Sequence, residues 1–142
     1  MIIRKFRYED LESVTMLAYS SLEEGYTPDF FLTLWETSPN GFIIAEEERV
    51  VGFILGVLTD IHSLRILMLC VEKAKRRKGV GTALIKALIQ NFPRVERVYL
   101  EVKVNNKGAI KFYEKLGFRI IDFLPHFYND GTDGYLMEKR LF

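Results

Sequence analysis

Five basic residues and two glycines gather in one short stretch of the sequence. They are Lys73, Lys75, Arg76, Arg77, Lys78, Gly79 and Gly81. A glycine lacks the Cβ atom that would keep a phosphate away from the backbone, and arginine and lysine side chains add positive charge around it. This pattern predicts a site for a pyrophosphate or a similar anion, centred on the basic turn, which we define as residues 72–79.

The basic turn lies between two apolar segments. Residues 66–71 form a continuous apolar run of strand length, and residues 83–92 repeat apolar side chains at helical spacing. A helix that begins directly after the turn would point its unpaired amide N–H groups and the positive end of its dipole at the anion. The plainer alternative is a glycine turn with a solvated basic surface.

Two common nucleotide-binding motifs do not fit this stretch. A Walker A loop is excluded because no Gly-Lys-Ser/Thr follows a four-residue spacer. The dinucleotide fingerprint needs a third glycine, and Leu84 stands in its place. Binding of a nucleoside triphosphate or of NAD is therefore disfavoured.

Size and composition limit the possible functions. At 142 residues and 49% hydrophobic, the chain is expected to form one domain spanning residues 1–142. The net charge is +1, so the basic turn is a local feature and nucleic acid is not the expected partner. The single cysteine, Cys70, excludes an intramolecular disulfide and lies in an apolar run, where we expect it in the core.

The sequence also gives expectations about location and metal binding. The N-terminus lacks an apolar signal core and no apolar segment approaches 18 residues, so we expect a soluble, cytoplasmic protein without a membrane partner. No metal site is visible, and His62 is interpreted as a surface loop residue.

The order of elements predicts an α/β fold with helices covering a mixed sheet. We expect strands at residues 1–6, 42–45, 50–55, 66–71, 98–104, 118–123 and 135–141, and helices that begin near residues 9, 28, 80 and 107. Thr27 and Asn106 are expected N-caps, and Gly117 is a natural helix stop. Glu101 alternates with apolar neighbours and should point to the less apolar face of its strand.

Two segments resemble a known superfamily. Residues 76–81, Arg-Arg-Lys-Gly-Val-Gly, resemble the Arg/Gln-x-x-Gly-x-Gly/Ala signature of Gcn5-related N-acetyltransferases (GNAT). Residues 100–118 look like the Leu-Glu-Val…Asn-x-x-Ala…Tyr…Gly-Phe segment of N-terminal protein acetyltransferases, closest to the ribosomal-protein alanine and archaeal branch. The resemblance covers nearly the whole chain. It implies a mostly antiparallel sheet with a splayed central pair of parallel strands.

The resemblance also implies acetyl-CoA as cosubstrate, with no metal. In the superfamily, the turn cradles the coenzyme A pyrophosphate, the preceding strand holds the pantetheine arm through its backbone, and an asparagine touches the cofactor. The corresponding residues here are Leu69, Cys70, Val71, Arg76, Arg77, Lys78, Gly79, Val80, Gly81, Thr82 and Asn106.

Acetyl transfer to an amine needs a base for the amine and a proton for the departing thiolate. The resemblance implies Glu101 as the base and Tyr113 as the acid. Glu24 is the alternative base, because residues 22–26 resemble a Leu-Pro-Glu-Asn-Tyr-Pro loop that shapes catalysis and substrate choice, although Glu23 and Gly25 depart from it. From the residues alone, Glu101 could be a surface glutamate and Tyr113 a core aromatic.

Substrate contacts are implied for Glu24, Tyr26 and Tyr128. Phe127 precedes Tyr128 where N-terminal acetyltransferases often carry a second tyrosine, which leaves the substrate preference open.

The first hypothesis for function is direct acetyl transfer from acetyl-CoA to protein N-termini, without an acyl-enzyme on the buried Cys70. An α-amine is about 10% neutral at pH 7 and a lysine about 0.04%, so a weak carboxylate base favours the α-amine. The alternatives are a small-molecule acetyltransferase for a polyamine or an amino acid, and a noncatalytic coenzyme A-binding module, which would not need Glu101 and Tyr113. A monomer and a homodimer both stay open.

Overall fold

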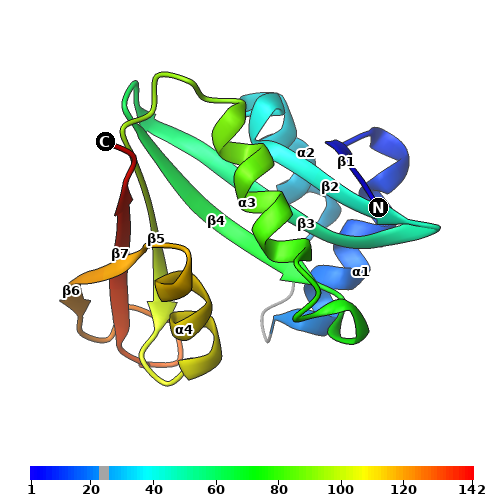
Figure 1. The fold of residues 1–142 in the computed structure, drawn as a ribbon. Helices are drawn as coiled ribbons and strands as arrows, with labels where there is room; N and C mark the ends of the chain where they lie inside the picture. Colours follow the sequence, from blue (N-terminus) through cyan, green and yellow to red (C-terminus); the bar gives the residue numbers. More distant parts are fainter. Residues whose placement is uncertain (23–25) are drawn as a thin grey trace. The chain divides into compact units, whose positions relative to one another are not determined.

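The computed structural model describes residues 1–22 and 26–142 (Figure 1). Its strands are β1 Ile2–Lys5, β2 Phe42–Glu47, β3 Arg49–Asp60, β4 Ser63–Val71, β5 Arg97–Lys103, β6 Arg119–Leu124 and β7 Gly134–Arg140. Its α-helices are α1 Leu11–Ser21, α2 Pro28–Thr37, α3 Val80–Gln90 and α4 Lys107–Lys115, and short 3-10 turns span Tyr8–Asp10, Pro39–Gly41 and Lys73–Lys75. The predicted elements are therefore all present, with β3 running five residues further than expected.

The strands form one sheet in the order β1-β2-β3-β4-β5-β7-β6. The pairs β1–β2, β2–β3, β5–β7 and β6–β7 are antiparallel, whereas β4 and β5 are parallel. The parallel register joins Ser63–Arg65 to Arg97–Tyr99, which is three of the nine residues of β4. The predicted mixed, mostly antiparallel sheet with a parallel pair of strands is confirmed.

The chain divides into two compact units. The first unit comprises Met1–Val57 and Ile66–Pro93, and the second comprises Leu58–Arg65 and Arg94–Phe142. Strand β4 supplies residues to both units. The single domain expected over residues 1–142 stays a prediction.

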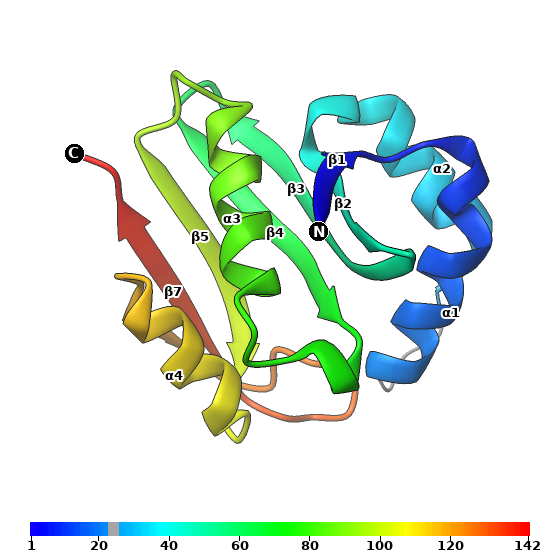
Figure 2. The ribbon, with the colours of Figure 1, turned by 45° about the vertical axis from the view of Figure 1, so that its right-hand side comes forward.

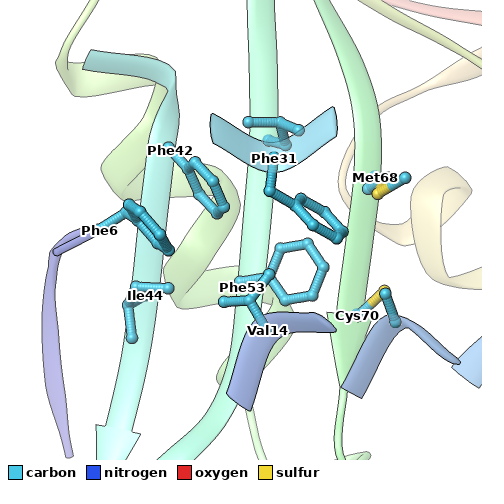
Figure 3. Packing of buried hydrophobic residues seen from close by; sticks show 10 residues of the cluster. Phe6, Val14, Phe31, Phe42, Ile44, Phe53, Met68 and Cys70 are labelled. Carbon is cyan, nitrogen blue, oxygen red and sulfur yellow. The ribbon is translucent and has the colours of Figure 1, made fainter. Parts of the chain in front are cut away.

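Aromatic side chains dominate the core of the first unit (Figure 3). Phe31, Phe42 and Phe53 are fully buried, and the rings of Phe31 and Phe53 meet edge to face at 5.9 Å. Met68 and Cys70 of β4 complete this cluster beneath α1 and α2. The prediction of Cys70 as a core residue is confirmed, with 1% of its surface exposed.

Helix α3 packs on the opposite face of the first unit's strands, and Gly52 lets it approach closely. A Cβ atom on Gly52 would lie 3.0 Å from the carbonyl oxygen of Cys70 and 3.2 and 3.3 Å from the side chains of Val80 and Leu84. Figure 2 shows α3 crossing β3 and β4, with α1 and α2 on the other side. Because successive strand residues face opposite sides, Phe53 joins the aromatic core while Gly52 lies under α3.

The predicted caps and alternation are also confirmed. Thr27 Oγ1 accepts a hydrogen bond from the amide of Phe30 at 3.2 Å, and Asn106 Oδ1 accepts one from the amide of Ala109 at 3.2 Å. In β5 the apolar residues are buried and Glu101 lies on the more open face. In β4 alternate side chains are fully buried, and Leu67, Leu69 and Val71 between them are half-buried.

Among the residues that the structure describes, no helix is long and apolar enough to cross a membrane. In residues 1–22 and 26–142, no group of three or more His, Cys, Asp or Glu side chains could hold a metal ion.

Candidate functional site

The basic turn leads directly into α3, and the first amide groups of this helix have no intrahelical hydrogen-bond partner. Gly79 is the N-cap of α3 and has a φ of 86°, a left-handed conformation that favours glycine. A Cβ atom there would meet nothing within 4 Å, so the space beside the helix start is free. The first helical hydrogen bond joins the amide of Ala83 to the carbonyl of Gly79 at 3.0 Å. The N–H groups of Val80, Gly81 and Thr82 therefore precede any intrahelical bond and can bind an anion.

Some basic side chains of the turn contact other protein groups, and others do not form an ion pair in the described residues. Arg76 Nε donates to the carbonyl oxygen of Val71 at 3.0 Å, and Lys75 Nζ lies 3.3 Å from Glu47 Oε1. Arg77 and Lys78 are exposed, and within the described residues neither forms an ion pair. The helix start thus offers amide donors, space beside Gly79, and basic side chains without ion pairs. These features fit the phosphates of coenzyme A.

The strand that leads into the turn carries Leu69, Cys70 and Val71. Leu69 and Val71 are half-buried, and Cys70 points into the core. Burial raises the pKa of the Cys70 thiol to about 12. Because the thiolate is the reactive form, Cys70 is not a nucleophile at neutral pH. The cofactor contacts predicted for the three residues stay predictions.

Glu101 is held by an arginine on the neighbouring parallel strand. Arg65 donates to Glu101 Oε1 from Nε at 2.9 Å and from Nη2 at 2.7 Å. The Glu101 side chain is 13% exposed, which leaves the carboxylate reachable but fixed. A carboxylate in this setting can accept a proton in a defined direction.

Tyr113 lies on the inner face of α4 and is 8% exposed. Its ring meets Phe112 at 5.2 Å and Phe118 at 5.4 Å, both edge to face. This packing fixes the orientation of the ring. A fixed ring is compatible with a proton donor and with a core aromatic residue. Asn106 caps the same helix, and its predicted contact with the cofactor stays a prediction.

Tyr128 lies in the loop of residues 125–133, between β6 and β7. Its amide donates to the carbonyl of Thr132 at 3.1 Å, and Lys103 Nζ lies 5.3 Å from its ring centroid. Lys103 also lies 3.0 Å from Asp130 Oδ2. Hydrogen bonds from the side chain and amide of Thr132 and from Lys103 lower the pKa of Asp130 to about 2, so this carboxylate stays charged and anchors the loop.

The other predicted substrate residues lie around residue 25. Tyr26 packs against Phe30 at 5.0 Å and Phe31 at 6.2 Å, at the edge of the aromatic core. Glu24, the alternative base, lies outside the described residues.

The first unit therefore holds the basic turn and Tyr26, and the second unit holds Glu101, Asn106, Tyr113 and Tyr128. Sequence reasoning missed Arg65 and Lys103, which contact two of these residues. A signal was present for Lys103, which is a charged residue within a strand of alternating apolar side chains, whereas Arg65 precedes the apolar run in which a strand was expected.

A cavity of about 360 Å³ in the second unit contains none of the predicted site residues. Its lining comprises Asp60, Ile61, His62, Ser63, Glu96, Arg97 and Arg140. His62 is exposed there, with Nδ1 3.1 Å from the carbonyl oxygen of Arg94, which agrees with a surface loop residue.

The chain matches a known family over most of its length. The acetyltransferase (GNAT) family matches residues 8–118. An uncharacterized N-acetyltransferase of Methanocaldococcus jannaschii is 40% identical over 99% of this chain and 92% of its own length. An N-alpha-acetyltransferase of Sulfurisphaera tokodaii is 34% identical over 98% of this chain and 92% of its own length.

A solved structure shows the same fold. The crystal structure of Ard1 from Thermoplasma volcanium superimposes with a TM-score of 0.94 at 38% identity, covering 99% of this chain and 97% of that chain. The similarity therefore extends over both units.

Proposed function

We propose that this chain, which belongs to the acetyltransferase (GNAT) family and is thus an acyltransferase, transfers acetyl from acetyl-CoA to the α-amino groups of protein N-termini. The observation that carries the proposal is the start of α3, where Gly79 is left-handed with free space at its Cβ position and three amides precede the first intrahelical hydrogen bond. The relatives named N-alpha-acetyltransferase support the choice of acceptor. We also propose that residues 1–142 act as one catalytic domain.

The basic turn and its strand would bind the cosubstrate. The amides of Val80, Gly81 and Thr82 would donate to the pyrophosphate, with Arg77 and Lys78 adding charge. The backbone of residues 69–71 would contact the pantetheine arm.

Residues of the second unit would move the protons. Glu101 accepts a proton from the acceptor amine, either directly or through water, as its nitrogen attacks the thioester carbon. The carbon–sulfur bond breaks, an amide forms, and Tyr113 supplies a proton to the departing thiolate. The reference pKa of a thiol is about 8.5 and that of tyrosine about 10, so this transfer is slightly uphill and requires a fixed donor.

The acceptor follows from amine protonation. An α-amino group offers a far larger neutral fraction at pH 7 than a lysine, and within the described site residues Glu101 is the proposed base. Tyr26 and Tyr128, with Glu24, would contact the peptide.

The test uses a peptide that bears both a free N-terminus and an internal lysine, together with spermidine and free alanine as competing acceptors. Mass spectrometry is expected to find acetyl on the α-amino group. Acetylation mainly on the lysine or on spermidine would contradict the proposed acceptor, and binding of coenzyme A without turnover of any amine would contradict the enzymatic role.

A further inference from the structure

The hairpin between β2 and β3 is tied to the basic turn by two ion pairs. Arg49 Nη2 lies 2.6 Å from Glu72 Oε1 and its Nε lies 3.2 Å from Oε2, so the guanidinium grips both carboxylate oxygens. Lys75 Nζ lies 3.3 Å from Glu47 Oε1. The hairpin tip, residues 47–49, therefore contacts the turn at two points.

The sheet holds the backbone on both sides of the hairpin tip. Glu47 and Arg49 are register partners across the hairpin, and Glu48 between them has a φ of 66°. The amide of Glu72 also donates to the carbonyl of Val51 at 2.8 Å, which fixes the first residue of the turn against β3. The two ion pairs thus start from backbone that the sheet already fixes.

Burial does little to fix the turn itself. Residues 73, 74 and 76–79 are exposed, so few core contacts restrain them. A loop that orders only when its ligand binds loses affinity to the entropy of ordering. Contacts that hold the turn beforehand would recover that affinity.

We propose that the hairpin tip positions the basic turn for the phosphates of coenzyme A, with Arg49 and Glu47 as positioning residues that act through Glu72 and Lys75. This inference rests on the proposed function. It assigns a role to Glu47, Arg49 and Glu72, which are not among the groups proposed to bind the anion. It also assigns one to Lys75, whose charge is partly neutralised by Glu47.

Electrostatic repulsion alone predicts that removing Glu47 or Glu72 would strengthen coenzyme A binding, which is opposite to the effect that positioning predicts. Glu47 and Glu72 bring negative charge to the surroundings of an anion site, and the guanidinium of Arg49 lowers the pKa of Glu72, so its carboxylate is charged at neutral pH. If charge alone mattered, removing either acid would tighten binding of coenzyme A. If positioning matters, removing either acid weakens binding. The sign of the change separates the two explanations.

The experiment measures the dissociation constant of coenzyme A by calorimetry for the wild type, Glu72→Gln and Glu47→Gln. We expect about three- to fivefold weaker binding for Glu72→Gln and a smaller loss for Glu47→Gln, in keeping with exposed ion pairs of which one is bidentate. Glu48→Gln is the matched control, because it removes the same charge from the same hairpin and breaks no ion pair in the described structure. It should bind as well as the wild type or slightly better.

A charge swap tests the pair directly. Arg49→Glu combined with Glu72→Arg keeps the net charge and can rebuild the contact in reverse, so its affinity should return to within about twofold of the wild type. In steady-state kinetics, Glu72→Gln should raise the Michaelis constant for acetyl-CoA and leave the turnover number and the Michaelis constant for peptide unchanged. Melting temperatures establish that each variant is folded.

Unchanged or tighter binding by folded Glu72→Gln would overturn the positioning role, as would a folded charge swap that binds no better than Glu72→Gln. If Glu72→Gln does not fold, the affinities of Glu47→Gln and Glu48→Gln for coenzyme A are compared. Weaker binding by Glu47→Gln supports the positioning role, and equal or tighter binding contradicts it. Failure of the wild type to bind coenzyme A would instead contradict the proposed function, and the positioning role with it.

Discussion

Arg65 donates two hydrogen bonds to a single carboxylate oxygen of Glu101, from Nε at 2.9 Å and from Nη2 at 2.7 Å. Both end on Oε1, so the guanidinium fixes the side chain through one oxygen and directs neither bond to Oε2. The parallel register places Arg65 opposite Tyr99, two residues before Glu101. The proposed base is thus oriented by the adjacent strand and keeps one oxygen for proton transfer.

Glu101→Gln should lower the turnover number by about 10²- to 10⁴-fold, because the amide has the same shape and cannot accept the proton. Calorimetry should show unchanged affinity for coenzyme A. Glu96→Gln is the matched control, since Glu96 is an exposed carboxylate next to the start of β5. Normal turnover by Glu101→Gln would exclude Glu101 as the base and leave Glu24 as the candidate.

The sequence was informative where a local rule decides the structure. Period-two alternation placed Glu101 on the open face of β5, and the cap rule placed Asn106 at the start of α4. Gly79 adopts a left-handed conformation, which favours glycine at that position of the basic turn. Each of these features depends on a few consecutive residues.

The sequence was less informative where partners are far apart along the chain. Arg65 and Glu101 are separated by 36 residues, and Arg49 and Glu72 by 23. Strand order and register bring such side chains together, and neither follows from local pattern. The same limit applies to β4, because its continuous apolar run does not show which side chains are fully buried, and only alternate ones are.

Tyr113→Phe should lower the turnover number by about 10²- to 10⁴-fold and leave coenzyme A affinity unchanged, because the variant lacks the proposed proton donor and keeps the ring. The retained ring should keep the edge-to-face contacts with Phe112 and Phe118. Tyr99→Phe is the control, since it removes a hydroxyl that donates to Thr59 at 3.0 Å. A Tyr113→Phe variant with a lower melting temperature and normal turnover would make the tyrosine purely structural.

Gly79→Ala should weaken coenzyme A binding, and this loss should exceed that of a control variant with the same loss of folding stability. Gly131 has the same φ of 86° and likewise has nothing within 4 Å of an added Cβ atom. Both alanine variants should therefore lose about 1–2 kcal/mol of folding stability from left-handed strain. Only Gly79→Ala should also lose coenzyme A affinity in calorimetry. Equal affinities in the two folded variants would contradict the assignment of the basic turn.

The stability of the protein should fall between pH 9 and pH 12 in a way that depends on Cys70. Burial raises the pKa of its thiol from 9.0 to about 12. Above pH 9 the unfolded thiol loses its proton while the folded one keeps it, so rising pH favours unfolding. Chemical denaturation across this range should show a smaller decline for Cys70→Ala than for the wild type. An identical decline would mean that the thiol is not shielded from water.

Tyr128→Ala should raise the Michaelis constant for peptide and leave that for acetyl-CoA nearly unchanged. The ring is held close to Gly134, where an added Cβ atom would lie 3.2 Å from Tyr128 Cε2, and Lys103 lies over its face. A ring fixed in this way offers area and a hydroxyl to a substrate at little entropic cost, so its loss should raise the constant about tenfold. Steady-state kinetics with each substrate varied in turn measures both constants. Tyr19→Ala, at an exposed position of α1, controls for removal of a surface tyrosine. Equal peptide constants for Tyr128→Ala and Tyr19→Ala would exclude Tyr128 from the peptide site.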